Sequence, residues 1–341
     1  MNSFENVRRA VRFGTPERLP MEFDSMGLSD KRGVGPDFRS ERTLGDGTGR
    51  DHFGCVWAKT AAHNMGQVKG HPLEDPRALR GYKWPDPDDP AAYAAIPEKL
   101  ARAEAEGKYV TVGIFMLLFE RMHSLRGFAR TLEDLYLEPE LSAELADRLT
   151  EFDCRVIENC VSAAGAGRIH GFGFTDDWGT QQNAFVSPEF WRQFFGPRYK
   201  RIFDLAHGFG WDVHMHSCGK VNDLVEPLIE IGLDAINLQQ PRALGIEEIG
   251  RHYRGRICFV SLCDIQQTLP FKGGREIREE AELLLAHWAT PEGGFVLSDY
   301  GDGEAIGVPI EKKRAMLAAF RELDPWAARS GARRPEPVGA E

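Results

Sequence analysis

The sequence has no long hydrophobic run. No stretch approaches the roughly 18 consecutive apolar residues that a membrane-spanning helix needs. Residues 1–9 also lack an apolar segment after their charged residues, so we do not expect a secretory signal there. Cysteine is scarce, with neither a CxxC pair nor the even spacing of a disulfide framework. These absences predict a cytoplasmic protein with reduced thiols. The six cysteines are Cys55, Cys154, Cys160, Cys218, Cys258 and Cys263.

Strongly basic segments and nucleotide-binding loops are missing as well. The formal net charge is −10 and no basic stripe is present, which argues against non-specific binding of nucleic acid. No GxGxxG or Walker-type loop follows a predicted strand, which argues against a nucleotide-binding open sheet. Internal repeats of roughly 20 to 50 residues are not apparent. We therefore expect a small-molecule substrate or a protein partner.

From about residue 108 the sequence alternates regularly between short apolar strands and amphipathic helices. This alternation predicts βαβ units and a parallel sheet. Because no nucleotide-binding loop is present, we expect the sheet to close into a (β/α)8 barrel of the TIM type with an N-terminal helical and loop extension. Strands are predicted at 19–23, 109–114, 168–174, 211–217, 234–238, 256–262 and 293–298, with 54–57 as a possible eighth. Helices are predicted at 3–13, 139–165, from Ser187 onward, and at 220–231, 245–253, 274–290 and 309–322.

The chain is predicted to form one domain over residues 1–325. Within it, residues 27–97 are rich in Gly, Pro and Asp, and we expect them to form a loop-rich cover of the barrel mouth. Residues 326–341 are rich in Pro, Ala, Arg and Gly and are predicted to be a disordered tail.

One strand end carries residues that suit a metal. Side chains alternate along a strand, so His214, His216 and Cys218 share one face of 211–218. Zn²⁺ takes nitrogen and sulfur ligands, and Gly219 lets the chain turn sharply after them. The alternative is that these residues pack in the core or support other ligands. Cys263 ends the strand 257–262 and is either a further ligand at the same mouth or a buried small hydrophobe.

Acidic and polar residues follow several other predicted strands. In a parallel barrel the catalytic groups lie at the carboxyl ends of the strands. Two adjacent carboxylates, Asp176 and Asp177, suit acid–base work or substrate binding, and capping of a turn is the alternative, which we favour more for Asp176. Predicted catalytic residues are Asp177, Glu120 and Asp299, and predicted substrate-binding residues are Gln239, Trp178 and Tyr300.

Taken in order, these features resemble a known superfamily over most of the chain. The matching segments are Thr15–Pro20, Ser187–Trp191, Pro197–Lys200, His216–Gly219 and Gly293–Phe295. They are similar to the uroporphyrinogen decarboxylase-like barrels, which include zinc-dependent methyltransferases that pass methyl groups to or from a corrinoid. The resemblance implies a (β/α)8 barrel with an N-terminal extension, in agreement with the alternation of elements.

Departures from the family pattern indicate the branch. The decarboxylase proper has an Arg-Gln-Ala-Gly-Arg segment after its first strand, whereas residues 21–27 here contain no arginine. They carry Glu22 and Asp24 instead, and these two carboxylates would repel a substrate with many carboxylates. The decarboxylase's histidine after the last strand is also absent from 298–303. Decarboxylation of uroporphyrinogen itself is therefore not expected.

The methyltransferase branch, which the sequence resembles more closely, implies a zinc motif of His-x-Cys plus a cysteine after the last strand. His216 and Cys218 match the first part, but Tyr300 or Gly301 stands at the last position. The resemblance therefore leaves the third ligand as Cys263, as a carboxylate such as Asp299, or absent. Members of the superfamily that demethylate aromatic ethers vary their zinc ligands in a similar way.

The leading hypothesis is a zinc-assisted methyltransferase that takes a methyl group from a small donor, such as a methoxylated aromatic in an O-demethylation, and delivers it to the cobalamin-type corrinoid of a partner protein. Zn²⁺ would be held by His216, Cys218 and Cys263 or another third ligand, and Asp177 or Glu120 would supply a proton to the leaving oxygen. One alternative is a metal-free decarboxylase of a small acid or tetrapyrrole. Another is a non-catalytic barrel that binds a corrinoid or tetrapyrrole.

Overall fold

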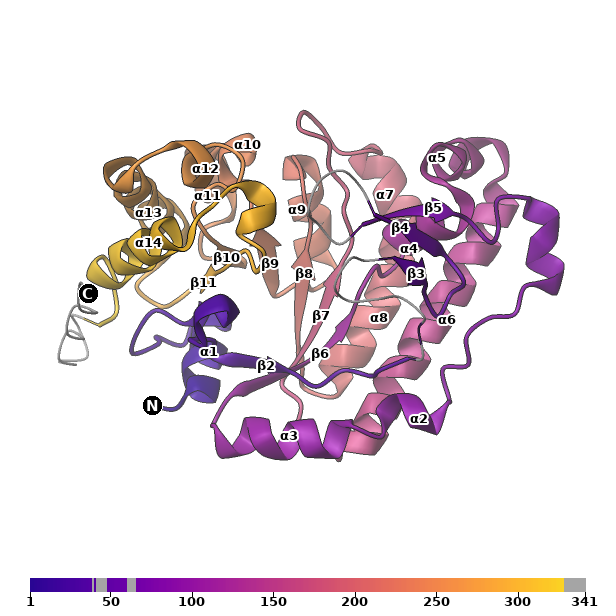
Figure 1. Cartoon of the computed structure of the whole chain (residues 1–341), viewed down its shortest axis with the longest axis horizontal. Coiled ribbons are helices and arrows are strands. Elements are labelled where there is room, and N and C mark those ends of the chain that lie inside the picture. The colour runs from indigo at the N-terminus through magenta and orange to yellow at the C-terminus, as the bar shows by residue number, and fades with distance from the viewer. Residues whose placement is uncertain (39, 41–47, 60–65, 328–341) are drawn as a thin grey trace.

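Eight parallel strands form a nearly closed barrel surrounded by helices in the computed structural model, which describes residues 1–38, 40, 48–59 and 66–327 (Figure 1). Their order around the barrel is β1-β11-β10-β9-β8-β7-β6-β2. The strands are β1 (Met21–Glu22), β2 (Lys31–Gly33), β6 (Tyr109–Ile114), β7 (Gly171–Thr175), β8 (Asp212–His216), β9 (Ala235–Leu238), β10 (Cys258–Ser261) and β11 (Phe295–Ser298).

The edges of the sheet, β1 and β2, are consecutive in the chain and lie close together. The backbone N–H of Asp30 donates to the carbonyl of Met21 at 2.6 Å. The Lys31 ammonium, on β2, also forms an ion pair with the carboxylate of Glu22, on β1. These contacts link the first strand to the last one in the sheet order, so the prediction of a (β/α)8 barrel is confirmed.

All seven strands predicted with an apolar pattern are present, but the suggested eighth was wrong. Residues 54–57 run into β4 (Val56–Ala58), which pairs with β3 (Gly49–Arg50) and β5 (Gln67–Gly70) in a separate antiparallel sheet. The eighth barrel strand is β2, whose sequence is Lys-Arg-Gly. Three residues of this composition give neither apolar alternation nor β propensity, so no sequence pattern marks them as a strand.

Helices surround the barrel and connect its strands (Figure 1). Ser187 caps α7 as predicted, because its hydroxyl oxygen accepts from the N–H of Phe190 at 3.2 Å. The α-helices are α1 (Ser3–Val11), α2 (Pro90–Tyr93), α3 (Ile96–Ala105), α4 (Phe119–Arg126), α5 (Phe128–Leu137), α6 (Pro139–Ala164), α7 (Pro188–Phe194), α8 (Gly196–Gly208), α9 (Asn222–Glu230), α10 (Pro241–Leu244), α11 (Ile246–Tyr253), α12 (Thr268–Phe271), α13 (Gly274–Trp288) and α14 (Ile310–Glu322). Short 3-10 turns are η1 (Asp24–Met26), η2 (Pro76–Gly81) and η3 (Glu304–Ile306).

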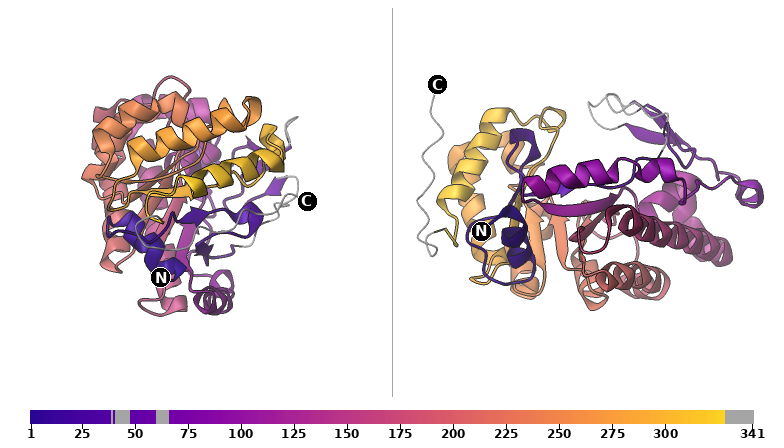
Figure 2. Two further views of the ribbon diagram at one scale, coloured as in Figure 1. Left: turned by 90° about the vertical axis from the view of Figure 1, so that its left-hand side faces the viewer. Right: turned by 90° about the horizontal axis from the view of Figure 1, so that it is seen from below.

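Helix α1 closes the end of the barrel at which the strands begin (Figure 2). Val7 and Ala10 on this helix pack in one buried cluster with Tyr109, Ala235 and Val296 from the starts of three strands. Burial of apolar surface here stabilises the barrel at the end away from the expected active site. The opposite end, at which the strands finish, is left for chemistry.

The segment 27–97 contains more regular structure than the predicted loop-rich cover. Its described residues include β2, the β3–β5 sheet, α2 and the beginning of α3. The β3–β5 sheet lies beside α4, the helix that follows β6: the Cys55 thiol donates to the carbonyl of Ser124 at 3.3 Å, and Arg121 pairs with Asp51 at 2.9 Å. The sheet therefore lies at the end of the barrel where the strands finish.

The ordered chain continues beyond the predicted domain end at residue 325. Trp326, which we placed in the tail, is buried, and its indole N–H donates to the carbonyl of Pro291 at 3.2 Å. The predicted tail from residue 328 to 341 lies outside the described residues. In the part of the chain that the structure describes, no helix combines the length and apolar character needed to cross a membrane.

Candidate metal and active site

The register of two neighbouring strands brings the candidate ligands together. Thr175 at the end of β7 is the partner of His216 at the end of β8. Asp177 and Cys218 each follow two residues later, so both loops leave the sheet at the same level. The N–H of Cys218 donates to the Asp177 carboxylate at 2.7 Å, which fixes the two loops to each other.

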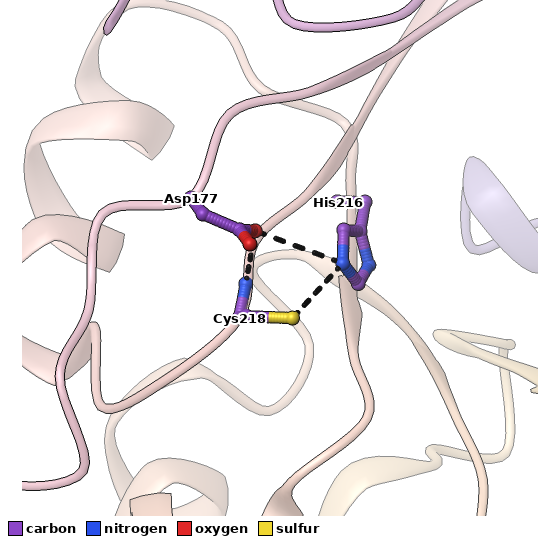
Figure 3. A group of neighbouring side chains, drawn as sticks. All are labelled: Asp177, His216 and Cys218. Atoms are coloured by element: carbon purple, nitrogen blue, oxygen red, sulfur yellow. Dashed lines mark hydrogen bonds and ion pairs between the residues drawn. The ribbon is translucent and has the colours of Figure 1, made fainter. Parts of the chain in front are cut away.

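Asp177, His216 and Cys218 form a compact group of possible metal ligands (Figure 3). One ligand atom from each lies within 4.8 Å of the others, and no other group of at least three His, Cys, Asp or Glu residues in the described chain meets this criterion. The Cys218 Sγ atom is 3.3 Å from Nε2 of His216, and that nitrogen is 3.7 Å from the Asp177 carboxylate. All three residues are half-buried.

A contact between two glycines makes this approach possible. Gly219 has φ +81°, in the left-handed region that favours glycine. A Cβ atom on Gly219 would lie 2.2 Å from the carbonyl oxygen of Gly179, and one on Gly179 would lie 2.7 Å from the backbone nitrogen of Lys220. Only residues without a Cβ atom allow the loops after β7 and β8 to touch at this point, so the sharp turn predicted at Gly219 also serves the ligand geometry.

His216 is oriented by a residue on the neighbouring strand. Asn237 on β9 is its register partner, and the amide oxygen of Asn237 lies 2.5 Å from Nδ1 of the imidazole. The amide nitrogen of Asn237 donates to the carbonyl of Val260 at 3.0 Å and to the hydroxyl of Ser298 at 3.3 Å, so the oxygen must be the atom that faces His216. With the proton on Nδ1, Nε2 presents its lone pair to Asp177 and Cys218, the arrangement typical of a metal-bound histidine.

The acidic groups around this cluster alter one another's protonation. Burial, followed by the negative charges of Asp177 and Asp176, raises the pKa of Glu120 to about 8. Burial and the Asp177 carboxylate also raise the pKa of the Cys218 thiol. The hydroxyl of Thr175 donates to the Glu120 carboxyl at 2.8 Å and holds it beside the end of β7. Glu120 therefore carries a proton at neutral pH.

A cavity of about 350 Å³ occupies the barrel interior next to the cluster. His216 lines it, together with the predicted residues Gln239 and Asp299. Phe174, Met215 and Val260 give part of its lining an apolar character. The charged groups of the lining are of both signs: Lys31, Arg32, Glu22, Asp24 and Asp299. Mixed charges do not favour a ligand with many carboxylates, in agreement with the expectation from residues 21–27.

Two predicted metal ligands lie elsewhere. Cys263 is fully buried, and its thiol donates to the carbonyl of Ile277 on α13 at 3.4 Å, so it faces the helix layer and not His216. Cys263 is therefore not among the residues that the structure brings together as possible ligands. The carboxylate of Asp299, the other suggested ligand, pairs with the Lys313 ammonium at 3.0 Å and accepts from the N–H of Ser25 at 3.3 Å.

The two adjacent aspartates, Asp176 and Asp177, have different partners in the structure. Asp176 is fully buried and accepts from the N–H groups of Leu118, Phe119 and Glu120 at 3.0, 2.9 and 2.7 Å, so it caps the start of α4. This is the alternative that we favoured for Asp176. Only Asp177 joins the candidate ligands.

The predicted substrate-binding residues have different surroundings. Trp178 is fully buried, with its ring stacked on Phe119 at 4.5 Å between centroids and its N–H donated to Tyr199 at 3.1 Å. Its contacts are those of a packing residue, and it is not among the residues that line the cavity next to His216. Tyr300 is half-buried near the cluster, and burial, followed by the charge of Cys218, raises its phenol pKa. Gln239 lines the cavity, as noted above.

Sequence reasoning missed several polar residues of the cavity. Asn237 was passed over, although its place directly opposite His216 on the next parallel strand follows from strand register. His214 was assigned to the correct face and lines the cavity, but its Nδ1 lies 3.3 Å from the Lys31 ammonium and its Nε2 3.4 Å from the Tyr109 hydroxyl, away from the cluster. Lys31 could not be found because β2 itself carries no strand signal.

The chain is similar to several known proteins. A methyltransferase from Methanosarcina mazei has a similar structure, with a TM-score of 0.64 and 16% identity over 95% of this chain and 99% of that one. A 3-keto-D-glucoside 4-epimerase from E. coli has a TM-score of 0.41 and 15% identity over 66% of this chain and 83% of that one. A family 10 endo-β-1,4-xylanase from Gloeophyllum trabeum also has a TM-score of 0.41, with 12% identity over 73% of this chain and 90% of that one. No curated protein sequence matches the chain significantly. The sequence model described as uroporphyrinogen decarboxylase (URO-D) matches residues 60–323, and the chain therefore belongs to the uroporphyrinogen decarboxylase family.

Proposed function

We propose that this protein is a methyltransferase that moves a methyl group from a small donor to a corrinoid carried by a partner protein, with Zn²⁺ held by Asp177, His216 and Cys218. The observation that supports the proposal best is the meeting of these three residues at the ends of β7 and β8. The resemblance in fold to a methyltransferase is consistent with it.

The donor set fits zinc. Thiolate, imidazole and carboxylate are the three ligand types that Zn²⁺ takes in proteins, and three protein ligands with a fourth position open are typical of catalytic zinc sites. The Asp177 carboxylate and the Cys218 thiol are held beside each other, and burial followed by the Asp177 charge raises the pKa of this thiol. A cation between the two groups would offset both effects and favour the thiolate. Asn237 supplies the outer hydrogen bond that such a histidine requires.

Bound zinc would supply Lewis acidity toward an ether oxygen or a thiol of the donor. The chain contributes position and a proton. Glu120, whose pKa is raised mainly by burial, would donate a proton to the leaving oxygen, because a phenolate or alkoxide leaves poorly without protonation. Gln239 and His216 line the 350 Å³ cavity, whose size suits a small donor. The reduced acceptor is itself the nucleophile, so the chain needs none.

The metal is tested by zinc content. Protein purified without chelators is expected to hold close to one zinc per chain, and Asp177→Ala, His216→Ala and Cys218→Ala are each expected to lower this content. Cys258→Ala is the matched control, since that thiol is also buried in the barrel but lies outside the cluster. Zinc-free wild-type protein, or equal zinc loss in the control, would rule out this metal site.

The transfer is tested with cob(I)alamin as the acceptor. A panel of methoxylated aromatics and other small methyl compounds is incubated with the enzyme, and formation of methylcobalamin is followed by absorbance. We expect turnover with at least one donor, and we expect Cys218→Ala to abolish it. Zinc-bound protein that methylates no acceptor, including corrinoid protein from the same cells, would contradict the proposed transfer.

Decarboxylation of a small acid is the second candidate, and Glu120 is the observation that favours it. A carboxyl group protonated at neutral pH can return a proton to the carbon that loses CO₂. This reaction needs no metal, so zinc-free protein that still releases CO₂ from a small acid would favour it over methyl transfer.

A further inference from the structure

A second cavity lies outside the barrel, beside the end of β6. Its volume is about 580 Å³, and the β3–β5 sheet, α4 and α6 contribute to its walls. None of its lining residues lines the cavity next to His216. It is therefore a separate space, and the proposed methyl transfer gives it no role.

Aromatic rings form much of its wall. Phe53 and Phe152 meet edge to face with centroids 5.1 Å apart, and Phe38 stacks on His52 at the same separation. Phe115, at the end of β6, is also part of the lining and is 38% exposed. Edge-to-face and stacked contacts are the geometries in which a further flat ring can join such a cluster. The Arg121 guanidinium lies over the Phe53 ring, 4.3 Å from its centroid, so a ligand ring would meet Phe53 at its edge or its other face.

Two polar side chains buried in this wall have atoms without a partner. Asp153 on α6 is 2% exposed, and its Oδ2 atom makes no hydrogen bond to any described residue. Arg121 on α4 is also 2% exposed, and its Nε–H has no partner in the same part of the chain. Buried polar atoms of this kind are rare in folded proteins and call for a ligand or water. Both residues line the cavity.

The protonation of these groups defines what they can bind. Burial raises the pKa of Asp153 well above its ordinary range, which favours the protonated carboxyl, and a protonated carboxyl can donate a hydrogen bond. Burial also lowers the pKa of His52 to about 4, so this ring is neutral. Arg121 is charged, but Asp51 pairs with it at 2.9 Å. The two atoms without partners are therefore both donors, and they require an acceptor on the ligand.

We propose that this cavity binds an uncharged, planar aromatic molecule that carries a hydrogen-bond acceptor such as a carbonyl oxygen. The acceptor would lie between Asp153 and Arg121, and the ring would pack against Phe53, Phe115 and Phe152. An anion is disfavoured, because Asp37 and Asp51 also line the cavity and bring two carboxylates against one guanidinium. A cation without an acceptor group would leave the two donors unmatched.

The cavity is linked to the metal cluster through the β6–α4 connection. Met116 lines the cavity, and its N–H donates to the Thr175 hydroxyl at 2.9 Å, the same hydroxyl that donates to Glu120. Met116 has φ +62°, a strained value for a residue with a side chain. Glu120 and Arg121 are consecutive residues: Glu120 lies beside Asp177 of the cluster, and Arg121 lines the second cavity. The proposed ligand would thus lie next to the active site without entering it.

Coumarin is a suitable probe, because it is flat, neutral and carries a carbonyl. We expect calorimetry to show saturable binding of one coumarin per chain. Asp153→Leu should weaken this binding about tenfold, the usual cost of one lost buried hydrogen bond. Asp153→Asn keeps a donor and should stay within about threefold of wild type. Asp147→Leu is the matched control, since it removes an exposed carboxylate from the same helix.

Further ligands and variants keep the proposal falsifiable. Naphthalene, which has no acceptor, should bind more weakly than coumarin and should be insensitive to Asp153→Leu. Phe152→Leu, whose folding is checked by thermal unfolding, should weaken both ligands. The proposal is overturned if coumarin shows no saturable binding, or if N-methylquinolinium or coumarin-3-carboxylate binds more tightly. Loss of coumarin binding in His216→Ala but not in Asp153→Leu would place the probe in the barrel cavity and would also overturn it. None of these outcomes depends on methyl transfer.

Discussion

Replacing Asn237 by leucine should weaken zinc binding without removing a ligand. The Asn237 amide oxygen lies 2.5 Å from Nδ1 of His216, and the amide is itself held by Val260 and Ser298. Leucine has a similar volume but no acceptor, so the imidazole would lose both its tautomer preference and its fixed orientation. Loss of such an outer hydrogen bond typically lowers metal affinity by about 10- to 100-fold, or about 1.4 to 2.8 kcal/mol.

The assay for this prediction is competition for zinc between the protein and a chromophoric chelator. Asn159→Leu is the control, because it also removes side-chain hydrogen bonds of an asparagine but lies on α6, where the Asn159 amide bonds to Pro87 and Asp88. We expect the control to keep wild-type affinity. If Asn237→Leu binds zinc within twofold of wild type while Cys218→Ala does not, the argument that Asn237 orients His216 is wrong. If both bind normally, the metal lies elsewhere.

Three further perturbations follow from the packing and charges around the site. Gly219→Ala should lower the free energy of unfolding in urea by more than about 1 kcal/mol, because Gly219 has a positive φ and its Cβ would meet the backbone of Gly179. Gly301→Ala is the control, since nothing lies within 4 Å of the added Cβ, and its free energy of unfolding should stay within about 0.5 kcal/mol of wild type. Arg121→Met should lower the free energy of unfolding by about 3 to 5 kcal/mol, because it leaves the buried Asp51 carboxylate without its ion-pair partner. The double variant Arg121→Met/Asp51→Asn should regain part of this stability, and the pairing would be refuted if the effects of the two single substitutions were fully additive. Glu120 has a folded-state pKa of about 8 against an ordinary 4.5, so its contribution to stability is complete below pH 4.5 and is lost as pH rises toward 8. Unfolding measured from pH 5 to 8.5 should show this decline in wild type and a smaller one in Glu120→Gln.

The barrel could be predicted because its strands carry a strong local signal. The strands from 109 to 298 are short apolar segments separated by amphipathic helices, and their boundaries were found to within about three residues, as is usual for such patterns. The first edge of the barrel could not be predicted in this way. Strand β2 is held by backbone pairing to β6 and by the Lys31–Glu22 ion pair, both of which are tertiary contacts that no local pattern reports.

The site was predicted in part for a similar reason. His216 and Cys218 lie two residues apart on one strand, so alternation alone places them together. The third member of the group depends on which strands are neighbours and in what register. The sequence left this ligand as Cys263, as a carboxylate such as Asp299, or absent. The observed pairing of Thr175 with His216 puts Asp177 there instead. Cys263 stands two positions beyond the end of β10, where its thiol turns toward α13.

The loop after β7 shows how one strand end can serve structure and chemistry at once. Asp176 accepts three N–H groups at the start of α4, and this fixes the helix against the barrel. The next residue, Asp177, then faces His216 and Cys218, while α4 presents Glu120 toward this cluster and Arg121 toward the aromatic cavity. Moving α4 by the loss of Asp176 would therefore disturb both sites together, whereas removing Asp177 would affect only the metal. A comparison of Asp176→Ala with Asp177→Ala, with zinc content and coumarin binding as the two measurements, separates these roles.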